Sequence, residues 1–154
     1  MAWVTPITGR VPADLIARNS KAFLNVADWV RIDGNTTEVQ GQILSLLGLI
    51  VILIDLDAPA ITAHPSAGSI NDLVENIERV RIGAALPPAI GLVELKTDWQ
   101  PGNGAPAPNY THVNAWERNL DLLHEYLPNA AAYKVFCGVA ATGQPRFFQH
   151  RWRG

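Results

Sequence analysis

The chain has 154 residues and a formal net charge of −2, with 48% hydrophobic and 17% charged residues. That length suits one domain or two very small ones. The weak negative charge creates no field that would gather nucleic acid or an anionic membrane. A single cysteine, Cys137, excludes an internal disulfide framework. The low charged fraction indicates that neighbouring subunits cover part of the surface.

Two helices are expected in the first part of the chain. The first should run from about residue 11 to 24, and the second from about 28 to 47, where a glycine ends it. Asn25 or Asp28 can cap the second helix by accepting hydrogen bonds from free backbone N–H groups. Gly34 lies inside this helix and costs about 1 kcal/mol against alanine, but the helical spacing of the surrounding apolar residues outweighs that cost.

Strands are expected on either side of a third helix. The segment "LIVILIDL" (49–56) is rich in β-branched residues and apolar throughout its first half, which is typical of a buried strand. The third helix should follow at about 70–82 with Ser69 as its cap, and a short strand is predicted at 90–95. The apolar run 43–54 is about a dozen residues, whereas a membrane-spanning helix needs roughly 20.

A loop, a helix and a hairpin are predicted in the last part of the chain. Prolines and glycines at 97–109 indicate a loop, and a fourth helix should then run to about residue 126 and stop at Pro128. Residues 133–154 alternate apolar and polar side chains around a Thr-Gly pair, which predicts a β-hairpin. The expected fold class is therefore α+β, with about four helices and short strands in residues 1–128 and a C-terminal β-hairpin tail in residues 129–154.

One sequence pattern occurs three times along the chain. With Asn35, Asn76 and Asn119 in register, apolar residues stand three positions before and four positions after each asparagine. These spacings share one helical face, so each asparagine lies at the edge of a buried stripe, to which Trp29 and Trp116 contribute. Each copy follows a short apolar segment and a proline-containing loop. The pattern predicts three helices that dock through a similar stripe on a common core or a neighbour, although chance agreement explains the first copy equally well.

The second and third copies share a further asparagine near the start of the helix, at Asn71 and Asn114. Chance agreement therefore explains the similarity of the last two copies less well than it explains the first copy.

The phrases of this repeat resemble a known family. The segments "TPITGR…ADL…NSKAFLNVADWVRIDGN", "SINDLVENIERVR" and "LKTDWQPG…YTHVNAWERNLDLL" are similar to parts of small structural proteins of tailed bacteriophages and prophages, especially those of anaerobic Gram-positive hosts. The resemblance covers most of residues 3–127 through short motifs, and Gly9 and Gly34 stand where the family carries acidic residues. It implies a virion component of the tail, baseplate or neck, or a protein of host-binding appendages, made in the bacterial cytoplasm. It implies no catalytic residues.

No pattern of catalysis or metal binding stands out in the sequence. The four histidines form no His-x-x-x-His pair, and no phosphate-cradling loop or Gly-x-Ser-x-Gly elbow occurs. An enzyme that uses His112 or Cys137 is a weak alternative. Asp55 and Asp57 share one face of a predicted strand, where a polar edge explains them better than a cation site. We therefore expect no enzymatic activity, no cofactor and no metal.

The C-terminal segment "RFFQHRWRG" carries the strongest binding signal in the chain. Aromatic residues and arginine are enriched where proteins meet proteins, so we expect protein contact rather than stacking on nucleic acid. Packing on the helices of the same chain explains these side chains equally well. The residues expected at an interface are Trp3, Ile52, Phe147, Phe148, Arg151 and Trp152.

The sequence thus favours a non-enzymatic virion structural protein that assembles as a homo-oligomer, with copies of itself and other virion proteins as partners. The alternative from another class is a soluble binding module for a small ligand or host glycan. It would use Trp99, Trp116 and Tyr110 around the loop 97–109. No signal peptide, membrane partner or nucleic-acid partner is expected.

Overall fold

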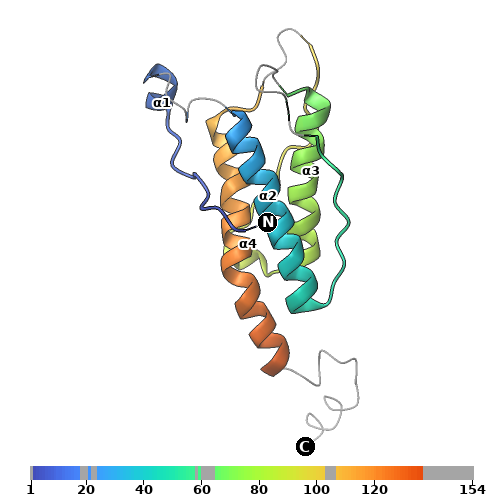
Figure 1. Ribbon diagram of the computed structural model, residues 1–154. Helices are drawn as coiled ribbons and strands as arrows, with labels where there is room; N and C mark the ends of the chain where they lie inside the picture. Colours follow the sequence, from blue (N-terminus) through green and yellow to red (C-terminus); the bar gives the residue numbers. More distant parts are fainter. Residues whose placement is uncertain are drawn as a thin grey trace, which may run out of the picture.

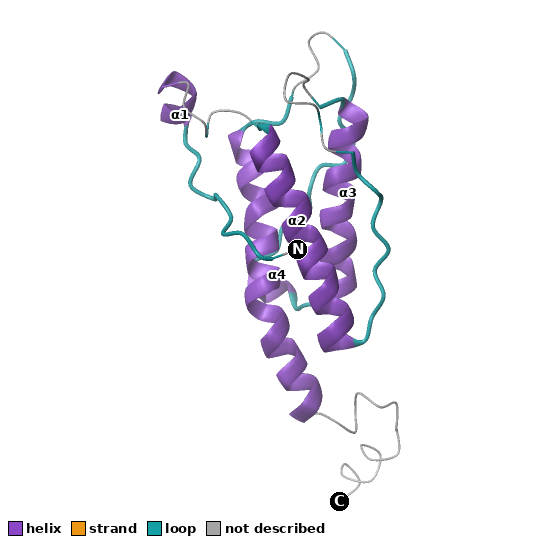
Figure 2. Cartoon of the chain, viewed as in Figure 1, coloured by secondary structure: helices purple, strands orange, loops and turns teal. Residues whose placement is uncertain are grey.

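The computed structural model describes residues 2–17, 21, 24–57, 59, 65–102 and 107–136. The elements in this part of the chain are all helical. They are α1 (Pro12–Ala17), α2 (Val26–Gln42), a π-helical turn (Ile43–Leu47), α3 (Ala67–Ala84), a 3₁₀ turn (Pro88–Ile90) and α4 (Tyr110–Phe136). Because the described residues contain no strand (Figure 2), the α+β class expected from the sequence is wrong for them.

The helices α2, α3 and α4 pack together as a bundle in which all three run in the same direction (Figure 1). Parallel neighbours need a long return connection, and here an extended segment runs back along the bundle before each helix. We call these segments strap 1 (residues 2–10), strap 2 (residues 49–57) and strap 3 (residues 91–99). The described chain is therefore three copies of a strap followed by a helix.

The strands predicted at 49–56 and 90–95 are wrong, because these residues form most of straps 2 and 3. Their backbone is extended, as β-branched and apolar residues favour, but neither segment pairs with another strand in the part of the chain that the structure describes. Side chains of the helices supply the hydrogen bonds that a neighbouring strand would supply. The composition therefore predicted the local conformation and failed to predict the partner.

The start and end of α2 follow the sequence signals closely. Asn25 accepts a hydrogen bond from the backbone N–H of Asp28 at 2.9 Å, while Asp28 accepts one from the backbone N–H of Asn25 at 3.3 Å. The two candidate caps thus act together as a capping box. The helix continues through Gly34, as predicted. Gly48, with φ of +68°, ends the π-helical turn that continues α2, in the left-handed conformation that glycine tolerates best.

The other helix boundaries differ from expectation. Ser66, and not Ser69, caps α3, because its hydroxyl accepts from the backbone N–H of Ser69 at 3.0 Å. The fourth helix passes through Pro128 to Phe136. A proline inside a helix removes one hydrogen bond and crowds the carbonyl four residues earlier. The burial of Leu127 beside it opposes that cost.

This longer α4 also changes the predicted C-terminal tail. Residues 129–136, expected to begin the hairpin, are helical, so the predicted hairpin is wrong there. The remainder of the hairpin lies outside the described residues, as does part of the first predicted helix, of which α1 covers residues 12–17.

The core lies between the three helices and consists of the apolar stripes that share a face with the repeated asparagines. Trp29 and Trp116, placed on these stripes by the sequence, are both almost fully buried. The apolar side chains with no exposed surface are Ile32, Val39, Ile43, Leu73, Val74, Ile77, Val80, Leu120, Leu123 and Leu127. Leu95 and Trp99 of strap 3 belong to the same core, and side chains of straps 1 and 2 pack against it, so straps and helices share one interior.

Gly83 in α3 allows strap 2 to approach the helix closely, because a Cβ atom at this position would clash with Cγ2 of Val51. We expect Gly83→Ala to lower the free energy of unfolding by about 1–3 kcal/mol, as overpacking does. Gly41→Ala is the matched control, since a Cβ there meets open space. It should raise stability by about 0.5–1 kcal/mol, because alanine is the better helix former. Urea unfolding followed by circular dichroism measures both, and stabilisation by both substitutions would contradict the close approach.

Candidate functional site

Each strap is held by an asparagine that binds both backbone polar groups of one strap residue. The side-chain carbonyl accepts from the backbone N–H, and the side-chain NH₂ donates to the backbone C=O of the same residue. A side-chain amide offers donor and acceptor side by side, as a peptide group of a neighbouring strand would. The pairs, with N–O distances of 2.6 to 3.1 Å, are Asn35 with Val4, Asn76 with Ile54, and Asn119 with Val93.

Straps 1 and 3 have a second clamp of the same kind from the helix on their other side. Asn114 of α4 binds the N–H and C=O of Arg10 at 3.2 and 2.8 Å, and Asn71 of α3 binds those of Trp99 at 2.8 and 3.0 Å. Each of these straps therefore lies in the groove between two helices. The pattern closes into a ring, because strap 1 joins the first helix of the bundle to the last.

Strap 2 lacks this second clamp. The position in α2 that corresponds to Asn71 and Asn114 holds Val30, an exposed residue. Other side chains hold strap 2: Gln40 of α2 donates to the C=O of Val51 at 2.6 Å, and Arg79 of α3 donates to the C=O of Ile52 at 2.9 Å. The first copy of the repeat thus departs from the other two in structure, as it does in sequence.

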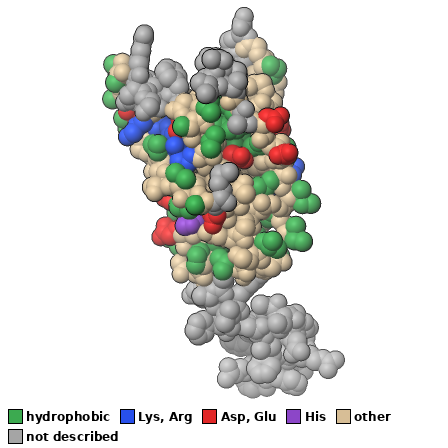
Figure 3. Space-filling view, in the orientation of Figure 1, with side chains coloured by type: hydrophobic (Ala, Val, Ile, Leu, Met, Phe, Trp, Pro, Cys, Tyr) green, Lys and Arg blue, Asp and Glu red, His purple; other side chains and the backbone are tan. Residues whose placement is uncertain are grey.

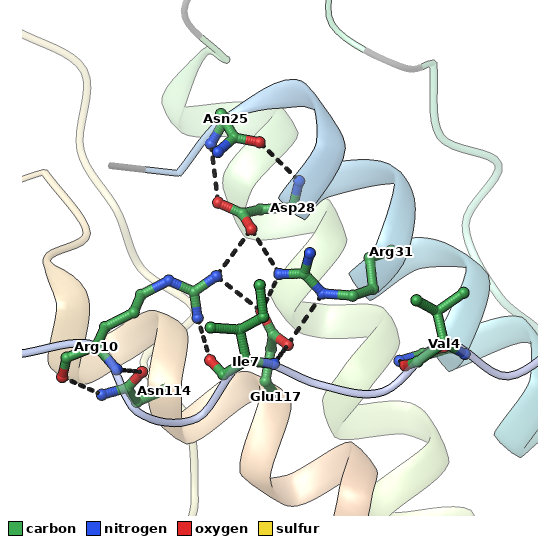
Figure 4. Close-up of polar contacts among 9 residues, drawn as sticks. Val4, Ile7, Arg10, Asn25, Asp28, Arg31, Asn114 and Glu117 are labelled. Atoms are coloured by element: carbon green, nitrogen blue, oxygen red, sulfur yellow. Dashed lines mark hydrogen bonds and ion pairs between the residues drawn. The ribbon is translucent and has the colours of Figure 1, made fainter. Parts of the chain in front are cut away.

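A buried network of four charged side chains holds the end of strap 1 (Figure 4). Arg10 pairs with Asp28 at 2.8 Å and with Glu117 at 2.9 Å, and Arg31 pairs with the same two carboxylates at 2.5 and 2.6 Å. Glu117, only 1% exposed, also accepts from the backbone N–H of Ile7. Two guanidinium groups balance two carboxylates, so the network has no net charge, as a buried ionic cluster requires.

The two carboxylates of this network favour the charged form of Arg31. Burial opposes the charge on Arg31, but hydrogen bonds to Glu117 and Asp28 outweigh that effect and raise the pKa of its guanidinium above the usual value. A group with a raised pKa contributes stability below its ordinary titration range and loses it only as the pH rises through the raised value. The contribution of Arg31 is therefore present at neutral pH and is lost only in strong alkali.

The aromatic residues of the binding-module alternative do not form a ligand platform. Trp116 is 1% and Trp99 is 4% exposed. The indole N–H of Trp99 donates to the C=O of Lys96 at 3.0 Å, and its ring meets the edge of His112 with 4.9 Å between centroids. Burial, together with the charge of Lys96, lowers the pKa of His112. Stacking on a sugar needs an exposed ring, so two of the three proposed side chains are unsuited to it. Tyr110, at the start of α4, is half-buried.

The remaining positions considered for metal binding or catalysis are Asp55, Asp57 and Cys137. Asp55 and Asp57 are exposed side chains of strap 2. In the described part of the chain, no group of three or more His, Cys, Asp or Glu side chains is placed to hold a metal ion. No helix among those residues is long and apolar enough to cross a membrane. Cys137 lies outside the described residues.

The expected interface residues fall into three groups. Trp3 stacks on His124 of α4 with 3.9 Å between ring centroids, so it packs within its own chain. Ile52 is exposed. Four of the expected residues lie outside the described part of the chain, namely Phe147, Phe148, Arg151 and Trp152.

Exposed aliphatic side chains gather where α2 ends and strap 2 passes the end of α3. Val51 faces Gly83, so its neighbours Ile50 and Ile52 point outward. No charged residue occurs between Glu38 and Asp55. In Figure 3, hydrophobic side chains lie along the right-hand side of the molecule, where Figure 1 places strap 2 and α3. We call this surface the aliphatic strip; its members are Leu44, Leu46, Leu49, Ile50, Ile52 and Ile82.

Comparison with known proteins adds no identification, because no family model, curated protein or solved structure matches the chain.

Proposed function

We propose that this chain is a non-enzymatic structural protein of a tailed-phage virion, associated with the tail, baseplate or neck, which assembles with copies of itself and with other virion proteins. The assignment to a virion rests on the resemblance of the repeated phrases in residues 3–127. The assignment to self-assembly is supported by one observation, the aliphatic strip.

The size of the strip makes self-association energetically reasonable. Monomeric proteins rarely expose a large contiguous apolar surface. Ile50, the most exposed member of the strip, is 81% exposed. Burial of one such side chain contributes about 1.5–3 kcal/mol, so the whole strip would contribute on the order of 10 kcal/mol. That is comparable with the roughly 4–15 kcal/mol that association costs in lost translational and rotational freedom.

The clamps hold the strap 2 part of the strip in place on the bundle. The buried asparagines and the ionic network are occupied in fastening straps to helices. Side chains of α2 and α3 hold strap 2 at Val51, Ile52 and Ile54. A contact surface on a fixed segment loses less conformational entropy on association than one on a flexible segment.

The mass of the purified full-length protein, measured by size-exclusion chromatography with light scattering, tests the proposal. We expect a defined oligomer, and we expect Ile50→Asp to shift it to smaller species while the circular dichroism spectrum stays helical. Val93→Asp is the matched control, because Val93 is an exposed aliphatic residue of strap 3 outside the strip. A wild-type chain that stays monomeric at all concentrations would contradict self-assembly.

The virion assignment has its own test. Mass spectrometry of purified phage particles from the strain that carries this gene should detect the chain at a fixed ratio to the tail proteins. Particles without it would contradict the assignment and leave the self-assembly result unaffected.

A further inference from the structure

We infer that copies of this chain join head to tail, with the projecting α1 of one copy docked on the aliphatic strip of the next. The inference rests on the proposed self-assembly and goes further, because it names two different contact surfaces and the order in which they join.

The chain makes a detour between strap 1 and α2. Arg10, at the end of strap 1, pairs with Asp28 at 2.8 Å, and the backbone N–H of Asn25 donates to the same carboxylate at 3.3 Å. The two residues that flank the segment 11–24 are therefore held at one carboxylate. With about 3.8 Å between consecutive Cα atoms, a few residues would close that gap. Most of the fourteen residues 11–24 are therefore not needed to connect strap 1 to α2.

This detour carries α1 away from the bundle (Figure 1). Ile16 in α1 is 86% exposed, more than any other large hydrophobic side chain of the described residues, and Val11 just before α1 is also exposed. A helix of this length is marginal in water without a surface to pack on. An apolar partner surface would therefore both stabilise α1 and cover Ile16.

The aliphatic strip is an apolar surface of this kind, but it lies at the other end of the bundle. The first helix of the bundle starts beside α1, and the strip begins where that helix and its π-helical turn end, at residues 43–47 (Figure 1). At 1.5 Å per residue, the distance from Val26 to Leu47 is roughly 30 Å. Because Arg10 and Asn25 anchor the detour at the near end, α1 does not cover the strip of its own chain.

Two different surfaces at opposite ends of one molecule make a heterologous contact. Such a contact leaves one free copy of each surface on every pair, so it continues into a closed ring or an open filament. Contact of strip with strip about a twofold axis would instead stop at a dimer. A head-to-tail contact therefore suits a protein that builds a ring-shaped or tubular part of a virion.

A mixing experiment with two single variants tests this arrangement. Ile16→Asp disables α1 and keeps the strip, whereas Ile50→Asp disables the strip and keeps α1. Each variant alone should be a monomer, because every contact needs both surfaces. An equimolar mixture should form one contact only, between α1 of the Ile50→Asp chain and the strip of the Ile16→Asp chain. Light scattering should then report twice the monomer mass, and the wild type a larger species.

The alternatives give different results. If Ile16→Asp assembles like the wild type, or if the two folded variants stay monomeric when mixed, head-to-tail joining is wrong and self-assembly through the strip still stands. If the wild type itself is a monomer, the proposed function fails as well. Ile52→Asp is a second strip variant in case Ile50→Asp loses its helical circular dichroism, and Val93→Asp should assemble as the wild type does.

Discussion

Glu117→Ala is expected to lower the free energy of unfolding by about 3–5 kcal/mol, because it removes one partner of a buried ionic cluster. The carboxylate of Glu117 pairs with both Arg10 and Arg31 and accepts from the backbone N–H of Ile7. Its loss leaves Asp28 alone against two buried guanidinium groups. Chemical unfolding followed by circular dichroism measures the change, and amide exchange at Ile7 should become faster.

The matched control is Glu75→Ala in the middle of α3. Glu75 pairs with Arg79 at 2.7 Å, but both side chains are solvent-exposed. Exposed ion pairs contribute about 0–1 kcal/mol, so this variant should unfold almost as the wild type does. Equal losses for Glu75→Ala and Glu117→Ala would show that burial of the network has no special role in holding strap 1.

Asn119→Ala is expected to lower the free energy of unfolding by about 2–4 kcal/mol. The side chain of Asn119 is fully buried, and its removal leaves both the N–H and the C=O of Val93 without their clamp. Each unpaired buried group costs about 1–3 kcal/mol, with some recovery through contact with water.

Hydrogen exchange separates this local effect from a general loss of stability. Under native conditions the amide of Val93 should lose protection, while the amide of Ile54, which Asn76 holds in the same way, should keep it. A Val93 amide that keeps its protection in the Asn119→Ala variant would contradict the clamp.

The repeat was the part of the fold most open to prediction from the sequence. Asn35, Asn76 and Asn119 are spaced from their apolar neighbours as one helical face requires, and this spacing located the three helices of the bundle correctly. The role of these asparagines was not predictable in the same way. Val4 precedes Asn35 by 31 positions and Ile54 precedes Asn76 by 22 positions. No local sequence pattern predicts which residue at such a distance a side-chain amide will bind.

Two kinds of error have clear physical causes. Straps 2 and 3 look like strands because β-branched residues favour extended backbone, whatever group supplies the hydrogen bonds. Pro128 looked like the end of α4 because local propensity says nothing about the buried packing of Leu127.

The ionic network was missed for a third reason. Arg10 and Glu117 are separated by most of the chain, and a pair so distant leaves no periodic signal in the sequence. Only the folded arrangement of strap 1, α2 and α4 brings the two side chains together.

The closure of the bundle by strap 1 has a consequence for biosynthesis. Arg10 leaves the ribosome long before Asn114 and Glu117, which lie more than a hundred positions later in the chain. The nascent protein therefore carries its earliest segment with only its α2 partners, Asp28 and Asn35, until α4 has been translated. Contacts of such high sequence separation slow folding, so emergence of α4, and not of the first helix, should set when strap 1 reaches its native position.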